Sequence, residues 1–118
     1  MSTDTVNLHI KKGARFDKVF TWKDSNGNLV PMAGLQGRMQ IRQKLDSLAY
    51  AVELTTENGG MTLGAADGTV TLYMGATATD ALTIDNGVYD IEIYDPLDVD
   101  NVTNLIGGVV TITQGVTR

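Results

Sequence analysis

Gly87-Val88-Tyr89-Asp90-Ile91-Glu92-Ile93-Tyr94-Asp95 and Gly107-Gly108-Val109-Val110-Thr111-Ile112-Thr113 are the two stretches that decide the fold of this chain. In the first stretch, apolar Tyr89, Ile91 and Ile93 alternate with acidic Asp90 and Glu92. A period of two is what a strand with one buried face requires. The second stretch is also β-patterned, and neither carries a reactive group. We predict that the two stretches pair as a hairpin near the end of the chain.

Shorter stretches with the same alternation fill most of the remaining sequence. They are residues 5–10, 15–23, 35–44, 49–55, 61–63 and 70–74. Pairs such as Asn26-Gly27 mark turns between them, because both residues tolerate positive φ. Pro31 cannot donate a ladder hydrogen bond, so residues 29–34 are predicted as an edge or connecting segment. Residues 77–82, which start with threonine and contain alanine, suit a short helical turn.

This pattern predicts an all-β fold of seven or eight short strands. Strands separated by turns at intervals of about 8 to 12 residues are typical of an antiparallel β-sandwich. A chain of 118 residues is long enough for one domain with its own core, so we assign residues 1–118 to a single sandwich domain. A closed barrel is the main alternative, because alternation alone does not show whether a sheet closes.

The aromatic residues divide into two groups by their position in the alternation. Trp22, Tyr50 and Tyr89 share the parity of neighbouring apolar residues, and we predict that they pack in the core. Tyr73 and Tyr94 have the opposite parity. Since tyrosine is enriched at protein interfaces, Tyr73 and Tyr94 are the candidates for a subunit contact.

Composition excludes several classes of protein. The chain has no cysteine, so it can form neither disulfides nor thiolate metal sites. It has no apolar run near the roughly 18 residues of a membrane helix, and its polar start lacks the regions of a signal peptide. We therefore expect a protein that is made and used without secretion and has no membrane partner.

The charges are distributed unevenly along the chain. The net charge is −5, but residues 1–45 carry eight Lys or Arg against three Asp or Glu, and residues 46–118 carry one against eleven. The acidic total argues against nucleic-acid binding, which needs clustered cations. The asymmetry is either a solvated mixed surface or a head-to-tail contact between subunits of a homo-oligomer. Residues 1–10 and 115–118 are the segments that we expect to be free to add to a neighbour.

The sequence contains weak candidates for chemistry, and each has a simpler explanation. His9 is the only histidine and is predicted on the polar side of a strand, without a partner nucleophile. Asp90 and Glu92 could serve as a glycosidase pair, but alternating acids are common on a solvated strand face. We therefore predict no enzymatic activity, no catalytic residue and no cofactor.

An acidic segment, residues 95–101, contains the only candidates for metal ligands. Asp95, Asp98 and Asp100 offer oxygen atoms that suit calcium. The segment lacks the sixth-position glycine and the closing glutamate of an EF-hand loop. A solvated hairpin loop is therefore the preferred interpretation.

Several of these segments together resemble small structural proteins of tailed bacteriophages. The likeness comprises Lys12-Gly13 to Phe20-Thr21-Trp22, Asp24 to Gly27 with Pro31 to Leu35, Gln40-Ile41-Arg42, Thr77 to Leu82 leading into Gly87 to Ile93, and Gly107-Gly108-Val109 with Gly115-Val116-Thr117. The plan is also similar to the immunoglobulin-like N-terminal domain of phage upper baseplate proteins. The chain differs from those proteins in having no long C-terminal extension.

The resemblance implies an immunoglobulin-like sandwich and a role in the virion. Proteins of this kind belong to the tail or baseplate, often as adaptors for fibres or receptor-binding proteins, and they assemble in the host bacterial cytoplasm. The implied partners are other virion proteins and further copies of the chain. A capsid decoration protein is an alternative, and so is a carbohydrate-binding module that would use Tyr73 or Tyr94.

Overall fold

The computed structural model describes residues 4–64 and 67–114, which form nine strands and one short helix. The elements are β1 (Asp4–Thr5), β2 (Leu8–Lys12), β3 (Phe16–Thr21), β4 (Gln36–Arg42), β5 (Val52–Thr55), β6 (Met61–Leu63), β7 (Thr69–Met74), α1 (Ala76–Asp80), β8 (Asn86–Asp95) and β9 (Asp98–Gln114). The predicted all-β fold is confirmed. The helix begins one residue before the predicted segment 77–82 and ends two residues before its end.

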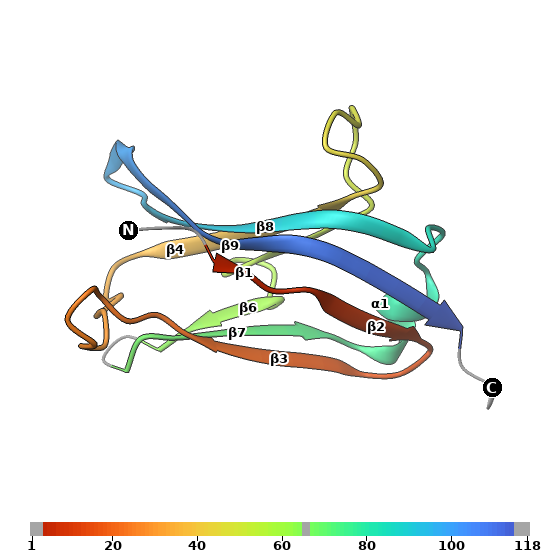
Figure 1. Cartoon of the computed structure of the whole chain (residues 1–118), viewed down its shortest axis with the longest axis horizontal. Coiled ribbons are helices and arrows are strands. Elements are labelled where there is room, and N and C mark those ends of the chain that lie inside the picture. The colour runs from red at the N-terminus through yellow and green to blue at the C-terminus, as the bar shows by residue number, and fades with distance from the viewer. Residues whose placement is uncertain (1–3, 65–66, 115–118) are drawn as a thin grey trace.

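The strands form two sheets that face each other across the core (Figure 1). Sheet A has the order β1-β9-β8-β4-β5, with β2 also paired to β9, and sheet B has the order β3-β7-β6. The predicted C-terminal hairpin, β8 with β9, lies in the middle of sheet A. Two separate sheets make the fold a sandwich, and the barrel alternative is wrong.

The N-terminal segment departs from the antiparallel prediction. Both β1 and β2 run parallel to β9, and Val6 between them donates a backbone hydrogen bond of 3.0 Å to Gly107. Counting β1 and β2 as one interrupted strand reduces the nine strands to eight, which is within the predicted seven or eight. Residues 4–10, which belong to the segment that we expect to add to a neighbour, are bonded along one side to β9 of the same chain. The tail 115–118 lies outside the described residues.

Close approach of the N-terminal segment depends on a glycine of β9. A Cβ atom at Gly108 would collide with the backbone carbonyl of Val6. The buried hydroxyl of Tyr89 donates a hydrogen bond to the same carbonyl. The absence of a side chain at Gly108 therefore leaves room for the Val6 carbonyl, and the Tyr89 hydroxyl binds it.

The core consists of the inward residues of both sheets. Its members are Leu8, Ile10, Phe20, Met32, Met39, Ile41, Leu54, Met61, Val70, Leu72, Met74, Leu82, Tyr89, Ile91, Ile93, Leu105, Ile106, Val110 and Ile112. Tyr89 is buried as predicted. Trp22 packs against this core as predicted but lies at its margin, where it is only half-buried. Tyr50 is exposed, because β5 begins at Val52 and Tyr50 belongs to the preceding loop.

Helix α1 closes one end of the sandwich beside the turn that joins β2 to β3 (Figure 1). Thr79 is its one buried residue, and its hydroxyl accepts a hydrogen bond from the Gly13 backbone at 3.1 Å. The same hydroxyl lies 2.8 Å from the Ala14 carbonyl oxygen. Within the described ranges, no helix has the length and apolar character needed to cross a membrane.

Candidate interaction surfaces

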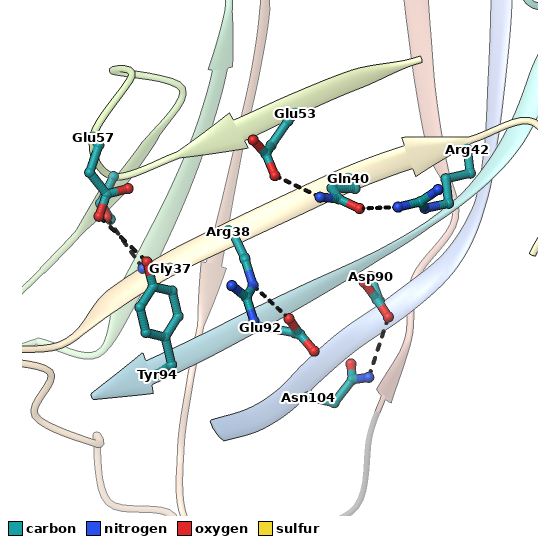
Figure 2. Close-up of polar contacts among 11 residues, drawn as sticks. Gly37, Arg38, Gln40, Arg42, Glu53, Glu57, Asp90, Glu92, Tyr94 and Asn104 are labelled. Atoms are coloured by element: carbon teal, nitrogen blue, oxygen red, sulfur yellow. Dashed lines mark hydrogen bonds and ion pairs between the residues drawn. The ribbon is translucent and has the colours of Figure 1, made fainter. Parts of the chain in front are cut away.

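The outer side of sheet A carries a cluster of polar side chains contributed by three adjacent strands (Figure 2). The members of this polar cluster are Arg38, Gln40 and Arg42 of β4, Glu53 of β5, and Asp90 and Glu92 of β8. They face outward because Met39, Ile41 and Ile91, at the alternate positions, are buried in the core. The antiparallel register then sets Arg38 opposite Glu92 and Gln40 opposite both Asp90 and Glu53.

Hydrogen bonds connect the polar cluster across the strands. Arg38 Nε lies 2.8 Å from Glu92 Oε1, and Gln40 Nε2 donates to Glu53 Oε2 at 2.6 Å. Arg42 donates to Gln40 Oε1, also at 2.8 Å. The hydrogen bond with Glu92 raises the pKa of the Arg38 guanidinium. These hydrogen bonds hold the side chains of the polar cluster in fixed positions on the outer side of sheet A.

Tyr94 extends this surface along β8. The Arg38 guanidinium lies over its ring, 4.9 Å from the ring centroid, which is a favourable cation–π distance. Burial raises the pKa of the Tyr94 hydroxyl, and the neighbouring Glu57 carboxylate raises it further. The hydroxyl lies 3.5 Å from Glu57 Oε1 (Figure 2).

The polar cluster lies beside a projecting loop, residues 43–51, which joins β4 to β5 (Figure 1). The loop is ordered by hydrogen bonds from Ser47 N to the Lys44 carbonyl at 3.0 Å and from Arg42 to the Ser47 carbonyl at 2.8 Å. Its leucines nevertheless point into solvent, with Leu45 88% and Leu48 103% exposed. Leu45 and the polar cluster border a shallow depression of about 400 Å³.

The outer side of sheet B is a second, smaller surface. Tyr73 of β7 and Val19 of β3 are both exposed there, on strands that pair with each other. The Arg15 guanidinium lies 5.3 Å from the centroid of the Tyr73 ring and forms an ion pair of 2.8 Å with Asp17. This surface therefore combines apolar side chains with a cation.

The two predicted interface residues do not lie on one surface. Tyr94 is half-exposed on the outer side of sheet A, and Tyr73 is exposed on the outer side of sheet B. The core lies between them. A single patch cannot contain both tyrosines, although each lies on an outer face as its parity predicted.

The structure gives each of the other candidate side chains a local hydrogen-bond partner. His9 on β2 is hydrogen-bonded to Thr113 at 2.8 Å. Asp90 accepts a hydrogen bond from Asn104 at 3.3 Å. The His9 and Asp90 side chains thus contact neighbouring strands of sheet A.

The acidic segment 95–101 is mostly strand. Only Pro96 and Leu97 connect β8 to β9, so the predicted hairpin loop is shorter than expected. Asp95 accepts a hydrogen bond from Leu97 N at 2.9 Å, and Asp98 accepts one from Asp100 N at 3.2 Å. No group of three metal-ligating side chains occurs among residues 4–64 and 67–114.

Two features of these surfaces were not predicted from the sequence. The exposed leucines of the 43–51 loop were overlooked, although a run of nine residues between paired strands is longer than hairpin loops usually are. The second feature is Asn58, whose side chain donates to the Glu53 carbonyl at 3.0 Å and accepts from Thr55 N at 2.9 Å. Asn58 thereby covers part of the outer edge of β5.

Comparison with solved structures identifies the fold. A chicken TCR matches with a TM-score of 0.53 and 12% sequence identity over 98% of this chain and 56% of the TCR chain. The extracellular domain of the voltage-gated sodium channel β4 subunit, described as a parallel homodimer with a role in cell–cell adhesion, matches with a TM-score of 0.49 and 7% identity, covering 98% of this chain and 97% of the other.

The match to the TCR chain shows an immunoglobulin-like β-sandwich, as predicted. This chain spans about half the length of the TCR chain that it matches. No protein-family model and no curated protein matches the sequence. Because one fold supports many unrelated functions, the function has to be argued from the surfaces.

Proposed function

We propose that this chain is a non-enzymatic structural protein of a tailed-bacteriophage virion. It acts as a tail or baseplate component, or as an adaptor that attaches fibres or receptor-binding proteins. Its partners are other virion proteins and further copies of itself, and it assembles in the host cytoplasm without binding nucleic acid or membranes. The resemblance of its turn and strand segments to small phage structural proteins supports the virion role.

One structural observation carries the non-enzymatic part of the proposal. The carboxylates that an enzyme would use are bonded within the surface, Glu92 to Arg38 and Asp90 to Asn104. Such cross-strand hydrogen bonds make the face rigid, and they pair both carboxylates with neighbouring side chains. A rigid, patterned face on a sandwich is suited to binding another protein, because little side-chain entropy is lost on contact.

Mass spectrometry of separated heads and tails from purified particles tests the proposed location. We expect peptides of this chain in the tail fraction at a constant ratio to a major tail protein. Detection only in heads would replace the tail assignment with capsid decoration. Absence from intact particles would refute the virion role.

A glycan array tests the carbohydrate-binding alternative. We expect no reproducible binding, because one face of the Tyr94 ring is covered by Arg38 and Arg15 lies over Tyr73. Binding that is lost on Tyr94→Ala or Tyr73→Ala, with an unchanged melting temperature, would favour a carbohydrate-binding module instead.

A further inference from the structure

The β8–β9 hairpin and β3 differ in net charge: the hairpin is acidic, although Arg38 and Arg42 of β4 lie beside it, and β3 is basic. Residues 86–101, which form β8, the hairpin and the start of β9, contain five carboxylates and no Lys or Arg. Residues 15–23, which form β3 and its flanks, contain three cations and one carboxylate. We name the outer side of residues 86–102 the acidic surface, and the exposed side chains of residues 15–23 together with Tyr73 the basic surface.

Each surface also presents apolar side chains that are available for burial. On the acidic surface, Leu97 at the hairpin tip is 94% exposed, and Val102 lies opposite Tyr94 in the β8–β9 register. On the basic surface, Val19 is 57% exposed and Tyr73 lies on the adjacent strand. Apolar contact gives affinity, and complementary charge gives orientation and a faster encounter.

The basic surface is accessible because β3 is an edge strand of sheet B. Lys18 is exposed although its neighbours Phe16 and Phe20 on the same side of β3 point inward, and its ammonium lies 5.8 Å from the Phe20 ring centroid. An exposed lysine at an inward position of an edge strand disfavours uncontrolled strand pairing. A contact through the outer side of β3 does not use the strand edge, so it can form although edge pairing is disfavoured.

The positions of the two surfaces determine the symmetry of the contact. They belong to opposite sheets, so two copies that met through identical surfaces would bring like charges together. We infer that the acidic surface of one copy binds the basic surface of the next, which is a heterologous, head-to-tail contact of a second copy of this chain. Such contacts close into rings or continue as filaments. In this arrangement Tyr94 and Tyr73 contribute to the same interface from different copies.

Thiol cross-linking tests this contact cleanly, because the chain has no cysteine of its own. Thr21→Cys on the basic surface and Val102→Cys on the acidic surface are both exposed positions that leave Tyr73 and Tyr94 intact. The two variants are mixed at low salt and treated with a short bismaleimide. The matched control replaces Thr21→Cys with Ala78→Cys, an exposed position on α1 that belongs to neither surface.

We expect the mixture of Thr21→Cys and Val102→Cys to give several-fold more cross-linked dimer than the control mixture, with loss of the excess in molar salt, where charges are screened. Each variant alone should stay at the control level. Strong cross-linking of Val102→Cys with itself would overturn the inference in favour of a symmetric contact. No excess over the control would overturn it as well.

The head-to-tail contact rests on the proposed assembly function, but separate experiments can refute the contact and the function. The cross-linking uses only purified protein, and the proposed function depends on the location of the chain in particles. Absence of cross-linking with the chain present in tails would reject only the head-to-tail contact. Cross-linking with the chain absent from particles would reject only the virion role.

Discussion

The hydroxyl of Thr79 lies 2.8 Å from the carbonyl oxygen of Ala14 and ties helix α1 to the turn between the two sheets. It also accepts a hydrogen bond from the backbone of Gly13. Thr79 is fully buried, so water cannot replace either bond. One hydroxyl group therefore serves a backbone donor and a backbone acceptor at the point where the chain passes from sheet A to sheet B.

Replacing this hydroxyl with a methyl group should destabilise the fold. For Thr79→Val we expect the free energy of unfolding to fall by about 1–3 kcal/mol, because buried backbone groups lose their partner. Urea denaturation followed by tryptophan fluorescence measures the change. Thr79→Ser keeps the hydroxyl and should recover most of the stability, and equal losses in both variants would show that the methyl group matters instead.

Gly108→Ala should detach the N-terminal segment from β9. The added Cβ would collide with the Val6 carbonyl, and overpacking of this kind typically costs about 1–3 kcal/mol. Hydrogen exchange at the Val6 amide, which is bonded to Gly107, should accelerate. Gly75→Ala is the control, because its Cβ would meet only the hydroxyl end of Tyr73 at 3.3 Å. Unchanged exchange at Val6 would contradict the proposed collision.

Stability should fall at high pH because of Tyr89. Burial raises the pKa of Tyr89 from 10.0 to about 12, so the folded state holds the phenol proton more strongly than the unfolded state does. The resulting stabilisation is complete below pH 10 and is lost as the pH rises toward 12. Denaturation midpoints measured across this interval should fall more steeply for the natural protein than for Tyr89→Phe. Parallel curves for the two proteins would refute the assignment.

Loss of the Asn58 side chain should expose an edge of sheet A. We expect Asn58→Ala to lower the free energy of unfolding by about 0.5–1.5 kcal/mol, because the exposed backbone groups of Glu53 and Thr55 exchange Asn58 for water. Analytical ultracentrifugation should also show increased self-association through the uncovered β5 edge. Asn26→Ala is the matched control, since the hydrogen bond between Asn26 and Asp24 uses the Asn26 backbone N–H. An unchanged sedimentation profile for Asn58→Ala would show that the edge does not drive association.

The sequence predicted the parts of the fold that depend on alternation. Tyr89, Ile91 and Ile93 all face the core, and the two C-terminal stretches pair as expected. Tyr50 was misassigned because its parity matches β5, whereas the strand begins two residues later. Alternation assigns a residue to the inner or outer face of a sheet only if that residue lies within a strand.

The parallel pairing of β1 and β2 with β9 could not be predicted from local patterns. Leu8 and Ile10 alternate in the same way whichever strand lies beside them. The pairing depends instead on Gly108 and Tyr89, which receive Val6 from the other end of the chain. A contact between residues so far apart in the sequence cannot be predicted from the pattern of a short segment.

The interaction surfaces were predicted in part. Asp90 and Glu92 do share a polar outer face, and Tyr73 and Tyr94 do face outward. The partner of Glu92 could not be predicted, because it depends on the register of β4 and β8, which places Arg38 opposite Glu92. Sequence parity also could not show that Tyr73 and Tyr94 lie on opposite sheets, because that depends on the order of the strands.

The pairing of β1 and β2 with β9 has a consequence for biosynthesis. His9 reaches Thr113, 104 positions further along the chain, so the N-terminal strands have no partner until the ribosome has made the C-terminal one. Contacts between such distant positions slow folding, because a large loop has to close before they form. Leu8 and Ile10 therefore lack their neighbouring strand until β9 has been made.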